Sequence, residues 1–117
     1  MHKNSFTSCI FTFGIPLLIS GVRQKVVLSI ILFACLASGL DYHSDPNEQS
    51  RKRDVLMSIL TGLFCLFCSF KLLILKFLFA SFALVRFKLY NIKYHETQHI
   101  KYVHIPSMLG MIIASCS

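Results

Sequence analysis

The chain has 117 residues and a formal net charge of +7; 55% of its residues are hydrophobic and 15% are charged. Ordinary globular proteins hold about 45–50% apolar and about 25% charged residues, so this chain has too few polar side chains to coat a water-soluble domain. Its apolar residues also lie in blocks separated by short charged clusters, which predicts a chain that resides in a lipid bilayer.

Residues 1–25 form an N-terminal apolar segment with a basic end. Its apolar block, from 6 to 22, has about 17 residues and stops at the run RQK. A bilayer core is crossed by about 20 helical residues, with a lower limit of about 17. Pro16 is expected to bend a helix at this point. The segment is therefore expected either to span the membrane as a third helix or to lie at its interface.

Residues 26–40 are predicted to form the first transmembrane helix. This block has only about 15 residues, so flanking residues or local bilayer thinning must complete the span. Ala37 and Gly39 are placed like the small residues before a signal-peptide cleavage point. A signal peptide rarely carries a second apolar block ahead of its basic region, however, so we expect the helix to be retained.

Residues 41–54 are predicted to form a polar loop followed by a helix start. Asp45 can accept backbone hydrogen bonds as the N-cap, Pro46 suits the first helical position, and Glu48 completes a capping-box pattern. A helix is therefore expected to begin near residue 46. Glu48 and Lys52 would then form an ion pair one turn apart.

Residues 55–85 are predicted to form the second transmembrane helix and its basic extension. No proline occurs from 47 to 105, so nothing in the local sequence forces a break at Lys71. One helix over about 55–75 would cross the bilayer core while the Lys71 side chain extends to the interface. With residues 26–40 it would form a helical hairpin, which makes the predicted fold all-α.

Residues 86–117 are predicted to form a basic aromatic tail with a short apolar C-terminus. The apolar run from 105 onward has about 13 residues, which is too few to span a membrane alone. Cations are more numerous from Lys71 onward than in the 41–54 loop. The positive-inside bias therefore predicts that both ends of the hairpin face the cytoplasm and that the loop lies on the other side.

The cations that flank apolar blocks are candidate contacts for anionic lipid headgroups. A nucleic-acid interface would instead gather its cations on a polar, water-exposed face, so no nucleic-acid partner is expected. Small residues in the two predicted transmembrane helices would allow close contact with another membrane protein or a second copy of the chain. The candidate headgroup contacts are Lys71, Lys76, Arg86, Lys88 and Lys93.

The run HETQHIKYVH, residues 95–104, contains the H-E-x-x-H pattern of zinc proteases. Such an enzyme needs a third metal ligand, but His104 lies one residue too near for the metzincin pattern and no acidic residue follows Glu96. The run is also rich in β-branched and aromatic residues, which favour extended structure over the required helix. We therefore expect no enzyme and no cofactor, with metal binding by His95, His99 and His104 as an alternative.

The expected function is that of a small multi-pass integral membrane protein that acts through helix and lipid contacts, without catalysis. An alternative is that the chain is the translation product of a non-coding or recently emerged reading frame. Abundant Phe, Leu, Ile, Ser, Lys and Cys, no Trp, short spans and incomplete motifs are what translation of an AT-rich stretch would give. No family motif runs through the sequence.

Overall fold

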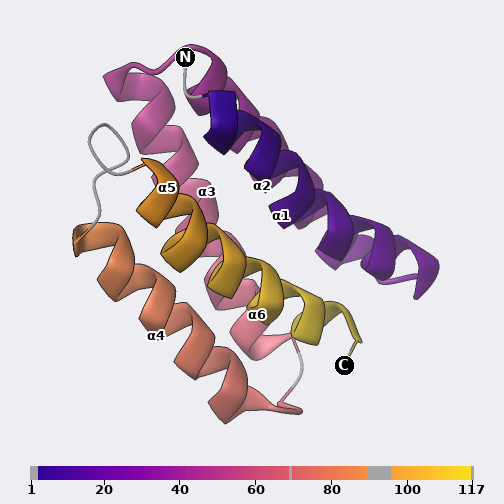
Figure 1. Cartoon of the computed structure of the whole chain (residues 1–117). Coiled ribbons are helices and arrows are strands. Elements are labelled where there is room, and N and C mark those ends of the chain that lie inside the picture. Colours follow the sequence, from indigo (N-terminus) through magenta and orange to yellow (C-terminus); the bar gives the residue numbers. More distant parts are fainter. Residues whose placement is uncertain (1–2, 69, 90–95, 117) are drawn as a thin grey trace.

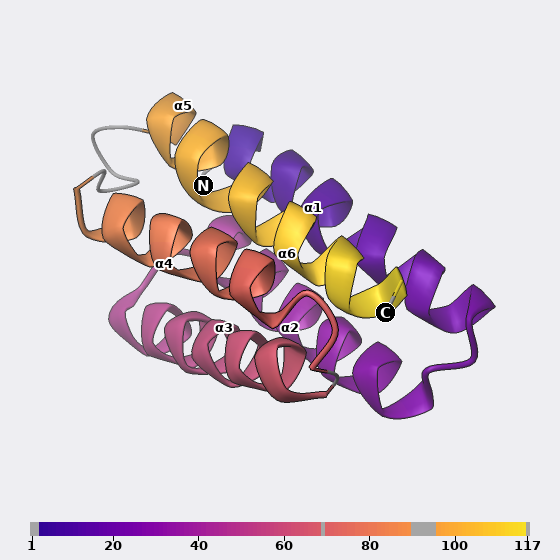
Figure 2. The ribbon, with the colours of Figure 1, turned by 90° about the horizontal axis from the view of Figure 1, so that it is seen from below.

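The computed structural model describes residues 3–68, 70–89 and 96–116, and all regular structure in these ranges is helical (Figure 1). The prediction of an all-α fold is therefore confirmed. The elements are α1 (Lys3–Val22), α2 (Val26–Ser44), α3 (Glu48–Phe67), α4 (Leu73–Leu89), α5 (Glu96–His99), a π-helical turn (Ile100–His104) and α6 (Ile105–Cys116). The last three follow one another without a break and form a single rod (Figure 2).

The helices α1 and α2 form an antiparallel hairpin whose chain reverses at the basic run between them (Figure 1). Gln24 adopts a φ of 59° in this turn, and the Lys25 N–H donates to the Ser20 carbonyl at 2.9 Å. The hydroxyls of Ser20 and Ser29, 2.8 Å apart, join the two helix ends. The N-terminal block is thus a helix that continues through Pro16.

The start of α3 differs from the predicted cap. Asn47, not Asp45, is the N-cap: its side-chain oxygen accepts from the Ser50 N–H at 2.9 Å, and its own N–H donates to the Ser50 hydroxyl at 3.1 Å. The predicted cap is wrong because α2 continues to Ser44, which leaves only a short connection. The predicted pair of Glu48 and Lys52 is confirmed, with 3.5 Å between its charged atoms.

The prediction of one helix across Lys71 is wrong, because α3 ends at Phe67 and α4 begins at Leu73. Leu72 has a φ of 55°, and the chain reverses direction there. The Lys76 ammonium then donates to the carbonyl oxygen of Cys65 at 2.7 Å. That carbonyl belongs to the last turn of α3 and also accepts from the Cys68 thiol at 3.5 Å, so the tertiary contact adds a charged donor at the helix end.

The helices close into a ring in which α1 packs on α2, α2 on α3, α3 on α4, α4 on α6, and α6 on α1 (Figure 2). Residues 105–116, predicted to belong to a tail, are instead a helix within this bundle, and Met111 and Ala114 are buried in its core. The bundle measures 36 Å along its longest axis.

The alternating helix directions place residues 41–54 at the same end of the bundle as the end of α4 and the whole of α5 (Figure 1). The Ser5 N–H donates to a Glu96 carboxylate oxygen at 2.9 Å, and the rings of Phe87 and His99 are 5.9 Å apart. The sequence had predicted opposite sides for the 41–54 loop and the cations of α4. Because the chain turns back at Leu72, the loop and the cations at the end of α4 lie at the same end of the bundle instead.

Two of the described helices, α1 and α2, are long and apolar enough to cross a membrane. The predicted pair was residues 26–40 and 55–85, with the N-terminal segment as a third candidate. The helix α3 begins with a charged run and α4 has 17 residues, so neither offers as long an apolar stretch. The candidate spans among the described helices are therefore α1 and α2, whereas the predicted pair was residues 26–40 and 55–85.

The bundle exposes large apolar side chains and buries polar ones. Leu18, Phe70 and Ile74 are 71%, 75% and 79% exposed, and apolar side chains of all the long helices share this outer position. Water-soluble proteins expose single apolar residues but rarely surround themselves with them. The polar and charged side chains in the interior are Ser5, Thr12, Ser20, His43, Ser50, Thr61, Lys76, His99, His104 and Ser115.

Candidate functional site

The candidate site lies inside the bundle at the end where α1 starts, α2 ends, α3 starts and α4 ends; this region is called the polar end. Three histidines from distant parts of the sequence meet there. His43 on α2, His99 on α5 and His104 in the π-helical turn are between 2% and 6% exposed. The ring centroids of His99 and His104 are 4.8 Å apart, and those of His43 and His104 are 5.6 Å apart.

The structure brings together two of the three predicted metal ligands, His99 and His104, because they lie on one continuous helical rod. His95 lies outside the described residues. His43 was not predicted, although it continues the buried spacing of α2 through Gly39 and Cys35. This spacing of buried residues along α2 is the signal from which an internal position of His43 could have been predicted. Within the described ranges no group of three or more His, Cys, Asp or Glu side chains is arranged to hold a metal ion.

His104 lies at the centre of the histidine cluster. Its Nδ1 is 2.9 Å from the hydroxyl of Ser8 on α1. Burial, together with the neighbouring His99 and His43, lowers the pKa of His104 well below its usual value. Burial disfavours a charged imidazole because the charge loses its hydration, and the neighbouring imidazoles lower the pKa further. His104 is therefore neutral at physiological pH.

Asp54 brings a carboxyl group to the same region from the second turn of α3. Its Oδ1 would be 3.5 Å from a Cβ built on Gly39 of α2, which shows how closely the two helices approach. Burial raises the pKa of Asp54 from 3.8 to about 6. No residue in the described part of the chain forms a hydrogen bond or an ion pair with this carboxyl. Asp41, by contrast, pairs with Arg53 at 2.9 Å on the surface.

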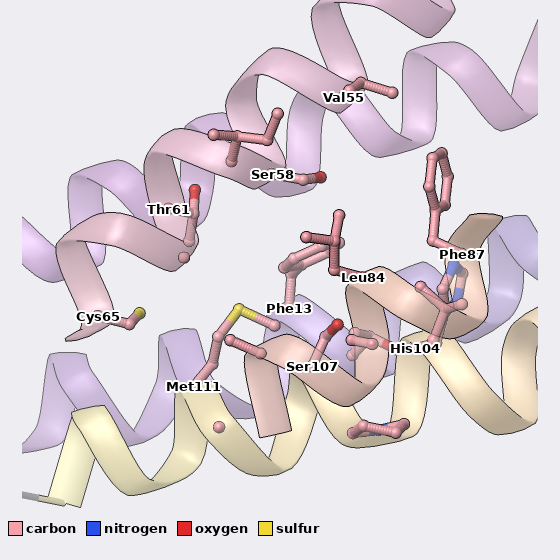
Figure 3. Close-up of a pocket in the computed structure, with 18 of the residues that line it drawn as sticks. Phe13, Val55, Ser58, Thr61, Cys65, Leu84, Phe87, His104, Ser107 and Met111 are labelled. Atoms are coloured by element: carbon pink, nitrogen blue, oxygen red, sulfur yellow. The ribbon is translucent and has the colours of Figure 1, made fainter. Parts of the chain in front are cut away.

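A cavity of about 380 Å³ extends from this cluster along the bundle, between α3 on one side and α4 and α6 on the other (Figure 3). Its walls are largely apolar, with Phe13, Leu84 and Met111 pointing into the space. The cluster of His43, Asp54, His99 and His104 lines one end. The buried Lys76, bonded to the Cys65 carbonyl, lines the other.

The residues predicted to contact lipid headgroups lie in different parts of the structure. Lys71 and Lys88 are exposed at opposite ends of α4, and Arg86 is half-buried near the polar end. The Arg86 guanidinium lies 5.1 Å from the Phe82 ring centroid and 5.4 Å from that of Tyr102, which are cation–π contacts. Lys76 is 2% exposed and faces the interior, so it is not a surface cation. Lys93 lies outside the described residues.

No protein-family model matches this chain, and no curated protein or solved structure matches it.

Proposed function

We propose that the protein is a small multi-pass integral membrane protein that acts through lipid and helix contacts and has no catalytic activity. The observation that carries the proposal is the broad apolar outer surface of the bundle, on which large apolar side chains of every long helix are exposed. Burying a Val, Leu, Ile or Phe side chain is worth about 1.5–3 kcal/mol relative to leaving it in water. Hydrocarbon around the bundle would remove that cost for the exposed apolar side chains of α1 to α4.

The proposed spanning segments are α1 and α2 up to residue 40, and the shorter apolar stretches 55–67, 73–85 and α6 pack against them within the bilayer. The polar end, with residues 41–54, 86–89 and 96–104, then lies at the level of the headgroups. Lys88 and Arg86 at this end and Lys71 at the other are positioned for anionic lipids. Lys93 is proposed for the same role from its place in the sequence.

The distribution of cations indicates an orientation. The end opposite the polar end carries Arg23, Lys25 and Lys71. The positive-inside bias therefore favours a cytoplasmic polar end, which replaces the orientation predicted for an isolated hairpin. The cations at the polar end outnumber those at the opposite end; they are Lys3, Arg51, Lys52, Arg53, Arg86, Lys88 and Lys101.

Membrane residence is tested with the full chain, carrying an epitope tag and expressed at low level. The expected result is a stable pool that sediments with membranes and stays there after washing with alkaline carbonate. Release of the chain into the aqueous fraction, or a monomer that is soluble without detergent, would contradict the proposal. Rapid degradation with no stable pool would favour the alternative of a translation product without a selected function.

A further inference from the structure

We infer that the interior cavity binds a lipophilic cation, a small molecule with one ammonium group and a compact apolar body, whose charge pairs with Asp54. The inference rests on the proposed function in one respect, because the bilayer would supply such a ligand. Binding itself can be measured on the purified chain. It can therefore fail while membrane residence stands.

The shape and lining of the cavity set the class of ligand. Sites for small molecules are concave spaces of about 300–1,000 Å³ with apolar walls and a few polar groups that fix orientation. This cavity, at about 380 Å³, belongs at the small end of that range. Phe13, Val55 and Phe87 line it beside Asp54, so an alkyl or aryl body would fill the space between α3 and α4 (Figure 3).

The sign of the ligand's charge follows from Asp54. It is the acidic residue among the described lining residues, and no ion pair or hydrogen bond within the described chain engages it. Asp54 is half-buried, and a carboxylate partly removed from water gains from an ammonium partner because attraction strengthens as the dielectric falls. The rings of Phe13 and Phe87 present π-electrons that also favour a cation.

The groups that line the cavity are compatible with a ligand that carries one positive charge and disfavour a ligand that carries two. The imidazole of His104 is held neutral by burial, so it does not compete for the carboxylate as a charged group. The opposite end of the cavity already contains the Lys76 ammonium, bonded to the Cys65 carbonyl. A second positive charge on the ligand would approach Lys76 and be repelled.

The orientation of the cavity also matches that of an amphiphile in a bilayer. A lipophilic amine places its ammonium among the headgroups and its apolar body in the hydrocarbon. Asp54, in the second turn of α3, lies at the polar end of the bundle. The apolar lining of the cavity extends to Met111 and Cys65 (Figure 3). The ligand could pass from lipid to cavity without reversing its direction.

The test is equilibrium binding of 4-phenylbutylammonium to the full chain in lipid nanodiscs, with empty nanodiscs subtracted. 4-Phenylbutanol, which has the same body without the charge, is the matched control ligand. Saturable binding of the amine, at least 10-fold tighter than that of the alcohol, is the expected result. Equal affinity for both ligands, or no saturable binding of either, would overturn the inference.

Three variants locate the site. Asp54→Asn is expected to weaken amine binding at least 10-fold, whereas Asp41→Asn, which removes a surface carboxylate, should change it less than 2-fold. Ala80→Leu, which adds bulk to a lining position, should weaken binding of both ligands. Helical content from circular dichroism establishes that each variant is folded. A folded Asp54→Asn protein that binds the amine like wild type would refute the assignment.

Zinc chloride is the competitor that separates a cation pocket from a metal site. The amine is expected to remain bound in the presence of zinc, because the histidine rings in the described part of the chain are not arranged as a ligand set. Displacement of the amine by one equivalent of zinc would assign the cluster to a metal and overturn the inference.

Discussion

The ammonium of Lys76 donates a 2.7 Å hydrogen bond to the carbonyl oxygen of Cys65, across the α3–α4 hairpin and in the interior of the bundle. Lys76 is 2% exposed. The contact provides a hydrogen-bond donor for the Cys65 carbonyl at the end of α3, and it fixes the Lys76 ammonium in the interior. Because of this hydrogen bond, the chain can reverse at Leu72 while the buried ammonium and the carbonyl oxygen remain paired.

Replacement of Lys76 by alanine should therefore destabilise the bundle by about 2 kcal/mol. A hydrogen bond from a charged donor is worth about 1.5–3 kcal/mol, and the Cys65 carbonyl would be left without this donor. Lys71→Ala is the matched control, because Lys71 is exposed, and should change stability by less than about 0.5 kcal/mol. Thermal unfolding in detergent, followed by circular dichroism, measures both. Equal unfolding midpoints for the two variants would contradict the importance of this contact.

Gly39 of α2 lies directly against the Cys9 side chain of α1. A Cβ added there would lie 2.6 Å from the Cys9 Sγ, so Gly39→Ala should cost about 1–3 kcal/mol through overpacking. Gly62→Ala, where a Cβ meets nothing within 4 Å, should be neutral or stabilising, because alanine favours a helix over glycine by about 1 kcal/mol. Adding Cys9→Ala to Gly39→Ala should recover part of the loss. Unfolding midpoints of the three proteins test the clash, and no recovery in the double variant would exclude it.

Asp54→Asn should stabilise the protein at pH 8 by about 1–2 kcal/mol, and this advantage should disappear near pH 4. Burial raises the folded-state pKa of Asp54 to about 6 from 3.8, so between these values the folded state binds more protons than the unfolded state. Stability contributed by this carboxyl is therefore greatest below pH 4 and is lost as the pH rises through 6. The titratable groups that interact with Asp54 from the surrounding helices are Cys9, Cys35 and Tyr42, and His43, His99 and His104 line the same end of the cavity.

The measurement is the difference in unfolding midpoint between the variant and the wild type at pH 8 and pH 4. The buried His104 has the opposite pH dependence, because its lowered pKa makes the folded state lose stability as the pH falls below about 6.5. That contribution is common to both proteins and cancels in the difference. A variant with a lower midpoint at pH 8 would show that the ionised Asp54 stabilises the fold.

The cysteines report the orientation of the bundle. Cys68 and Cys116 are exposed at the end opposite the polar end, whereas Cys9, Cys35 and Cys65 are buried. With a cytoplasmic polar end, a membrane-impermeant maleimide added to intact cells should modify the two exposed thiols. The variant with both replaced by serine should remain unlabelled. Modification of the wild type only after permeabilisation would show the opposite orientation.

The sequence by itself predicted the helical fold class, the apolar blocks, the surface pair of Glu48 and Lys52, and part of the histidine cluster. These features depend on composition and on residues within a few turns of one another. His99 and His104 were grouped through the H-E-x-x-H run alone, and the expectation of extended structure there is wrong, because residues 96–104 are helical. The pattern of apolar blocks depends on no long-range contact.

Only the tertiary structure decided that α3 and α4 are separate helices, that Lys76 is internal, and that His43 and Asp54 join the histidines. Neither proline nor glycine marks the reversal at Leu72; packing of α4 on α6 and the bond from Lys76 to Cys65 stabilise it. His43 meets His104 through contacts between helices far apart in the sequence. Local patterns cannot determine such contacts, because their free energy depends on side chains that become neighbours only when the ring of helices closes.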